Sequence, residues 1–121
     1  MEKEYHKLVR DRIPEIICQS GNECEVVILS DREYRQALRQ KLIEEAGEAA
    51  AADEDDLVAE LADLSEVMDA VMASFGISGD SLRDSYASRL LAEKTKRRET
   101  RGGFAKKIML LRTSLSKHPP C

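Results

Sequence analysis

Apolar positions recur at helical spacing through the middle of the chain. Between residues 55 and 75 they alternate four and three residues apart, at Leu57, Leu61, Leu64, Met68, Val71 and Phe75. This alternation is typical of the packing seam of a helical bundle. A similar pattern follows a Ser30 or Asp31 cap to about residue 52, and another follows Gly79 and Asp80 to about residue 98. We therefore predict three long helices.

Shorter elements flank these helices. Pro14 suits the first turn of a short N-terminal helix, which residues 20–22 would end. The β-branched run in residues 25–29 indicates a strand, and its expected partner is residues 107–111. The predicted fold class is mainly α: a bundle of three long helices plus the short N-terminal helix, with a minor two-stranded β element. We expect one domain over residues 1–113 and a disordered tail over residues 114–121.

Charge is divided unevenly along the chain. The net charge of -4 argues against a general nucleic-acid binder. Residues 44–69 hold eleven acids and no Lys or Arg, whereas residues 89–112 hold nine Lys or Arg and two acids. A chain with such blocks can bind a metal ion with the first and an anion with the second.

The remaining composition points to a cytoplasmic protein. Its three cysteines lack the spacing of a zinc site, and an odd number does not suggest a disulfide framework. The charged start has no apolar signal region behind it, and no apolar run approaches the roughly 20 residues that span a bilayer. We expect reduced thiols and no membrane partner.

Two pairs of acids, Glu45 with Glu48 and Glu60 with Asp63, are placed symmetrically about residue 54. A helical hairpin turning there would set all four at one level, with the inner two roughly 9 Å from the bend. Each acid on its own could simply face solvent. Because the pairs border apolar seams and the acidic block has no internal Lys or Arg, a bound cation is the competing interpretation. Lys41, four residues before Glu45, could help only one of them.

The donor set narrows the choice of cation. Carboxylates without nearby His or Cys favour Mg²⁺, or alternatively Mn²⁺. A di-iron site would need Glu-x-x-His pairs, and an EF-hand calcium site would need its ligands in one loop. Because Mg²⁺ usually completes its shell with substrate phosphates, this site predicts a phosphorylated ligand.

A basic run could bind those phosphates. Lys94, Arg97 and Arg101 precede Gly102 and Gly103, whose backbone N–H groups can approach phosphate oxygens closely. The alternative is that these cations only complement the dipole at the end of a helix.

Three segments together resemble a known superfamily. Residues 44–48, Glu-Glu-Ala-Gly-Glu, followed by residues 60–63, Glu-Leu-Ala-Asp, resemble the E-E-x-x-E and E-x-x-D signature of the all-α nucleoside triphosphate pyrophosphohydrolases. This superfamily includes MazG and phosphoribosyl-ATP pyrophosphohydrolase. Residues 5–14 resemble the start of its small stand-alone members, and residues 96–104 resemble their end.

The resemblance implies Mg²⁺-dependent cleavage between the α and β phosphates of a nucleotide, which releases a nucleoside monophosphate or analogue and pyrophosphate. This activity could serve nucleotide-pool house-cleaning, or the protein could be a phosphoribosyl-ATP pyrophosphohydrolase of histidine biosynthesis. A catalytically silent nucleotide-binding dimerisation module is the alternative from another class. Because one short chain leaves much of its helical seam uncovered, we expect a homodimer.

The resemblance also assigns roles by position. The metal ligands would be Glu45, Glu48, Glu60 and Asp63. Glu44 would be a water-orienting acid or a solvated residue. The β and γ phosphates would be held by Lys94, Arg97 and Arg101 with Gly102 and Gly103. Apart from the resemblance, the charges of the N-terminal segment could form a surface cluster or could fold over the site. We expect Lys7 or Arg10 near the ligand, and Asp11 and Arg12 in structural pairs.

Overall fold

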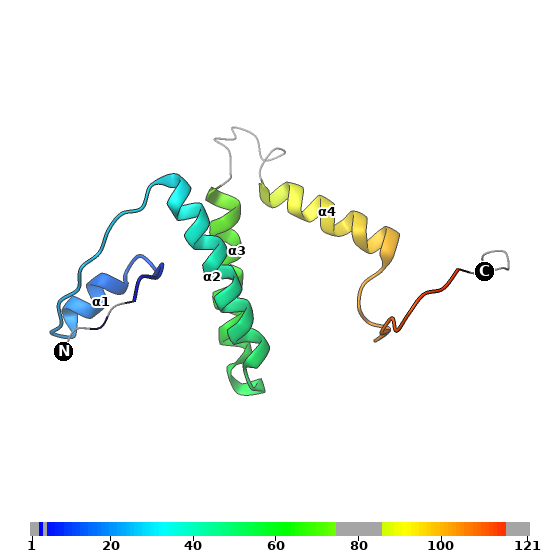
Figure 1. Cartoon of the computed structure of the whole chain (residues 1–121), viewed down its shortest axis with the longest axis horizontal. Coiled ribbons are helices and arrows are strands. Elements are labelled where there is room, and N and C mark those ends of the chain that lie inside the picture. The colour runs from blue at the N-terminus through cyan, green and yellow to red at the C-terminus, as the bar shows by residue number, and fades with distance from the viewer. Residues whose placement is uncertain (1–2, 4, 75–85, 116–121) are drawn as a thin grey trace. The chain divides into compact units, whose positions relative to one another are not determined.

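The computed structural model describes residues 3, 5–74 and 86–115, and it is mainly helical (Figure 1). Its helices are α1 (Ile13–Gln19), α2 (Asp31–Ala51), α3 (Glu54–Ser74) and α4 (Tyr86–Arg101). The predicted mainly α fold class is therefore confirmed. None of the helices in the described part of the chain is both long and apolar enough to cross a membrane. The contacts divide the chain into two units, Met1–Arg89 and Leu90–Cys121.

The start of α2 is fixed by a reciprocal cap at Ser30, one of the two capping residues that the sequence offered. The backbone N–H of Glu33 donates to the Ser30 hydroxyl at 3.2 Å, and the Ser30 N–H donates to the Glu33 carboxylate at the same distance. The Ser30 hydroxyl also donates to this carboxylate, at 2.8 Å. The hydrogen bond from the Ser30 hydroxyl, and to a smaller extent the one from the Ser30 backbone N–H, lower the pKa of Glu33 below its ordinary value.

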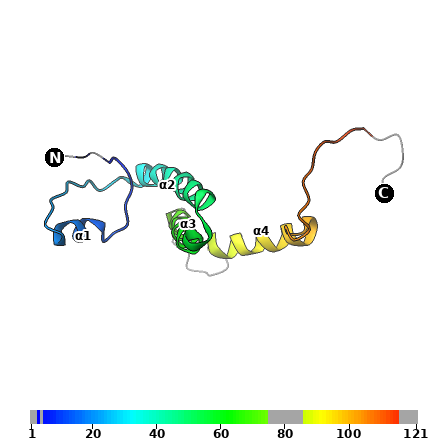
Figure 2. The same ribbon diagram turned by 90° about the horizontal axis from the view of Figure 1, so that it is seen from below.

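Helices α2 and α3 form the hairpin predicted around residue 54. Only two residues separate Ala51 from Glu54, so the chain reverses at once and the helices pack side by side (Figures 1 and 2). The Asp53 carboxylate accepts from the backbone N–H of Asp56 at 3.1 Å, which satisfies one free donor at the start of α3.

The packing face of α3 differs from the predicted seam. Val67 is its buried residue, while Leu61 and Met68 are exposed, and Phe75 lies outside the described residues. Glu60 and Asp63 precede Val67 by seven and four residues, so they share the face that packs against α2. The sequence predicted that these acids border the packing seam. The prediction differs from the structure because α3 has apolar residues on more than one face. The partner helix determines which face is covered.

The predicted pair of strands is not present in this structure. Residues 25–29 and 107–111 are both irregular, and the apolar side chains of Val27, Ile28 and Ile108 are largely exposed. A β-branched run favours extended backbone, but a strand forms only when a neighbour pairs with its N–H and C=O groups. Each segment has the local preference for extended backbone, but neither is paired with a neighbouring strand.

The other predicted boundaries are mostly confirmed. Pro14 lies in the first turn of α1, and the helix ends at Gln19. In the second unit α4 ends at Arg101, three residues beyond the predicted end at about residue 98. Gly102 follows with a φ of 83°, a left-handed conformation that glycine adopts readily. The predicted start of this helix at residues 79–80 lies outside the described residues, as do residues 116–121 of the predicted tail.

Candidate metal centre

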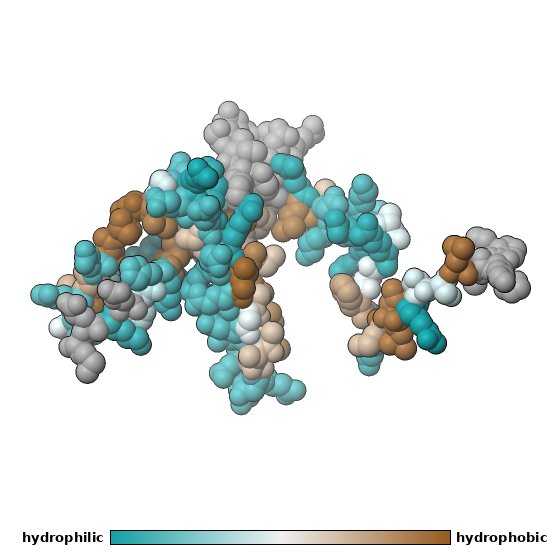
Figure 3. Space-filling model, viewed as in Figure 1, coloured by the Kyte–Doolittle hydropathy of each residue, from teal (hydrophilic) through white to brown (hydrophobic). Residues whose placement is uncertain are grey.

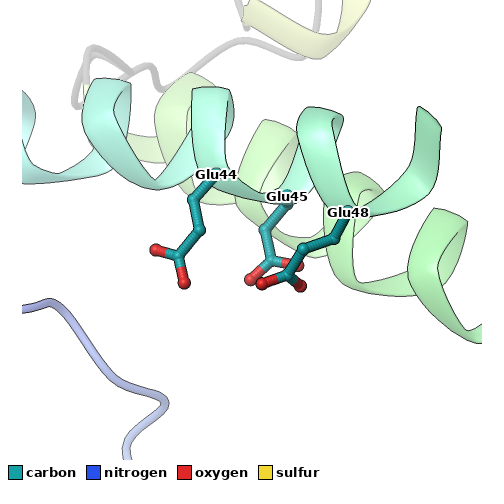
Figure 4. Close-up of side chains that lie close together, drawn as sticks. All are labelled: Glu44, Glu45 and Glu48. Carbon is teal, nitrogen blue, oxygen red and sulfur yellow. The ribbon is translucent and has the colours of Figure 1, made fainter. Parts of the chain in front are cut away.

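Five acids of the α2–α3 hairpin form two overlapping groups. The first comprises Glu44, Glu45 and Glu48 on α2, whose side chains extend from the same side of the helix (Figure 4). The second joins Glu45 to Glu60 and Asp63 across the hairpin. Within each group, one carboxylate oxygen per residue lies within 4.8 Å of the others. Glu45 belongs to both groups, so it is the central acid of the site.

The hairpin brings together the acids that the sequence predicted to lie at one level, but it groups them differently from the prediction. The sequence grouped Glu45, Glu48, Glu60 and Asp63. In the structure Glu45 reaches the α3 pair, whereas Glu48 is exposed and groups with its α2 neighbours. The difference follows from helix geometry, because residues three apart differ by about 60° around the axis. Glu45 points toward α3, and Glu48 is turned toward solvent.

The cross-hairpin group has unsatisfied buried oxygens. Glu45 is 6% exposed, and its Oε2 atom is buried without a hydrogen-bond partner. The Oε2 atom of Glu60 is also buried without a hydrogen-bond partner. A buried acceptor without a donor costs about 1–3 kcal/mol, and more when it is charged. Two such oxygens beside a third carboxylate fit the donor set of a hard divalent cation.

Lys41 partly neutralises the α2 group. Its Nζ atom lies 3.5 Å from Glu44 and 3.3 Å from Glu45. The prediction that Lys41 could help only one of the four paired acids is confirmed within the described residues, since it contacts Glu45 and its other partner, Glu44, lies outside the two pairs. Because Glu45 belongs to both groups, Lys41 also contacts the cross-hairpin group, and it is the pair of buried oxygens without hydrogen-bond partners that makes this group the better candidate for a metal ion.

A segment before α1 supplies two more cations. Arg10 donates from Nη2 to Oδ1 of Asp63 at 2.6 Å, and Nζ of Lys7 lies 3.9 Å from Glu44. Arg12 pairs instead with Glu15 of α1 at 3.3 Å. The sequence placed Lys7 or Arg10 near the site and Arg12 in a structural pair. The structure places both Lys7 and Arg10 beside the candidate acids.

A cavity of about 150 Å³ adjoins Glu44. It is lined by His6, Lys7, Leu8, Ala37, Gln40, Lys41 and Glu44. Sequence reasoning missed Ala37 and Gln40, although their spacing from Lys41 and Glu44 places all four on one face of α2. Both ammonium groups also contact the Glu44 carboxylate that lines this cavity, so an anionic ligand would compete with Glu44 for them.

The basic run lies on α4 and in the turn after it. Lys94, Arg97 and Arg101 are exposed, and Arg97 donates to Glu93 one turn earlier at 3.1 Å. Gly102 and Gly103 follow with open space where a Cβ atom would stand. These five residues belong to the second unit, and their role in phosphate binding stays a prediction.

About half of the chain is similar to a known protein. It is 52% identical over 54 residues to a protein of Mycolicibacterium smegmatis described only as uncharacterized. The aligned region covers 45% of this chain and 55% of that relative, so it spans about half of each. No protein-family profile matches the chain, and no solved structure matches it.

Proposed function

We propose that this protein is a Mg²⁺-dependent nucleoside triphosphate pyrophosphohydrolase that cleaves the bond between the α and β phosphates. The observation that supports this proposal best is the cross-hairpin group of Glu45, Glu60 and Asp63. Two of its carboxylates have buried oxygens without partners, and the three side chains come from two helices. The sequence resemblance supplies the reaction, because its acidic signature falls on these residues.

Each part of the proposed site has a separate task. Glu45, Glu60 and Asp63 would hold the metal ion, with Glu48 as a further ligand. A bound Mg²⁺ would neutralise negative charge on the phosphate oxygens and would lower the pKa of a water molecule bound to it. Lys7 and Lys41 line the adjoining cavity, where their ammonium groups can bind the phosphates. The proposed fold is a MazG-like bundle whose α2–α3 hairpin positions the acids, with the minor β element forming in the complete assembly.

The substrate class in this proposal is a nucleotide with at least two linked phosphates beyond the α position, or phosphoribosyl-ATP. The test is a panel of these nucleotides with Mg²⁺, in which pyrophosphate release is measured. Glu60→Gln and Asp63→Asn should each lower the rate by about 100-fold or more, because they remove charge where the metal binds. Glu66→Gln, an exposed acid on the same helix, is the matched control. Wild-type rates in both site variants would refute the assignment of these ligands.

A homodimer is part of the proposal, and an apolar stripe on α3 supports it. Val58, Leu61 and Met68 are 77%, 46% and 42% exposed, and their spacing of three and seven residues places them on one face. Apolar surface is visible along the hairpin in Figure 3. A second copy of the chain would bury this stripe.

The same stripe also favours the second candidate, a silent nucleotide-binding dimerisation module. Calorimetry with nucleotide and Mg²⁺ separates the two functions. Heat of binding without pyrophosphate release would support the silent module, whereas release would support the enzyme.

A further inference from the structure

The segment of residues 5–12, here called the basic arm, contacts both helices of the hairpin. Arg10 reaches Asp63 of α3, 53 residues later in the chain, and Lys7 reaches Glu44 of α2. Each contacted carboxylate belongs to one of the two candidate metal groups. The arm therefore places positive charge beside the same acids that a divalent cation would use.

The charges of the site show what the arm does. The two groups contain five carboxylates, and at least three cationic side chains, Lys7, Arg10 and Lys41, contact them. At most two negative charges then remain uncompensated by these contacts. Without Arg10 three negative charges would remain, and three attract a divalent cation more strongly than two. Arg10 and a metal ion at Asp63 thus oppose each other.

Arg10 is the cation that can leave. Lys41 is part of α2, and its side chain is only 17% exposed. Arg10 precedes the first helical residue, and the side chains of Arg10 and Asp63 are 59% and 43% exposed. Solvent-exposed ion pairs contribute little, even at short distance. A divalent cation, with twice the charge, can therefore take Asp63 from Arg10.

We propose that the basic arm is an exchangeable internal counter-ion, displaced from Asp63 when a divalent cation binds. This inference rests on the metal site of the proposed function. Displacement frees the Arg10 guanidinium, whose fork of donors suits phosphate oxygens. Metal binding would thus prepare the arm to bind the anionic ligand.

The test is direct titration with Mn²⁺ alone, followed by the electron paramagnetic resonance signal of the free ion. Arg10→Gln should bind Mn²⁺ about two- to fivefold more tightly than the wild type, the range that an exposed ion pair supports. Arg10→Lys retains the charge and should stay near the wild-type affinity. Arg12→Gln is the matched control, because Arg12 pairs with Glu15 outside the acid groups. Circular dichroism checks that each variant retains its helices.

Hydrogen exchange of the arm gives a second readout that does not depend on activity. The amides of residues 7–12 should exchange faster in wild-type protein when Mn²⁺ is added, because the arm loses its anchor at Asp63. Equal or weaker Mn²⁺ binding by Arg10→Gln would overturn the inference, because Arg10 would then orient Asp63 for the metal. It would leave the proposed metal site standing. A wild type that binds no Mn²⁺ would overturn the metal site and the inference together.

Discussion

Glu45→Gln should stabilise the protein in the absence of metal and weaken its response to metal. Glu45 is buried, belongs to both acid groups, and has an oxygen without a hydrogen-bond donor. Glutamine has nearly the same shape, and it replaces one carboxylate oxygen with an NH₂ group that can donate to the neighbouring acids. The substitution therefore removes like-charge repulsion and supplies a missing donor.

The magnitude follows from the contacts of Glu45. An unsatisfied buried acceptor costs about 1–3 kcal/mol, and the amide can recover part of this cost. The opposing loss is the charge attraction to Lys41, which lies 3.3 Å away. Lys41 keeps Glu44 as a partner at 3.5 Å, so it is not left unpaired. We expect the free energy of unfolding to rise by about 1 kcal/mol, which raises Tm by roughly 4 °C for a domain of this size.

Urea denaturation in EDTA measures this change, at one fixed protomer concentration because a dimer would make stability concentration-dependent. Glu48→Gln is the matched control: it removes the same charge from the same helix at an exposed position, and it should change the free energy by no more than about 0.5 kcal/mol. Metal at 100 times its Kd should add about 2.7 kcal/mol to the wild type and much less to Glu45→Gln. The order of stability should then reverse.

A fall of more than about 1 kcal/mol in the free energy of unfolding of Glu45→Gln in EDTA would refute this prediction. The carboxylate would then be a structural partner of Lys41 whose charge stabilises the hairpin. The metal site would lose its main energetic support, because an acid that is stable without a metal ion gives no reason to expect one.

Two further predictions concern the ends and the outer face of the hairpin. Ser30→Ala should cost about 1 kcal/mol at neutral pH by removing the cap of α2, as measured by urea denaturation. The contribution of Glu33 to stability is present above its ordinary pKa of 4.5 and is lost as the pH falls through its lower folded pKa. Ser30→Ala should therefore flatten the acid side of the plot of stability against pH. An unchanged plot would contradict this role of the cap. Leu61→Glu should weaken self-association by about tenfold or more in light scattering, whereas Ala73→Glu, at an exposed position on the same helix, should not. Equal self-association in both variants would remove α3 from the interface.

Local sequence signals determined the boundaries of the hairpin closely. The Ser30 cap, the apolar periodicity and the acids around residue 54 predicted α2 and α3 to within about two residues at each end. These signals act within one or two helical turns, so they can be read without knowledge of the rest of the chain. The strand predicted at residues 25–29 is not confirmed, because strand pairing depends on a distant segment of the chain.

The tertiary structure decided how the acids combine. Periodicity showed that Glu45, Glu60 and Asp63 share helix faces with apolar residues, but α3 has two apolar faces and only packing selects the one that meets α2. Packing against α2 on the Val67 face brought Glu60 and Asp63 toward Glu45 and left Leu61 exposed. The contact between Arg10 and Asp63 also required the folded chain, because no local pattern relates residues 53 positions apart. The sequence by itself determined the helices and the chemistry they carry, because both depend on neighbouring residues, and the long-range packing determined which charges meet.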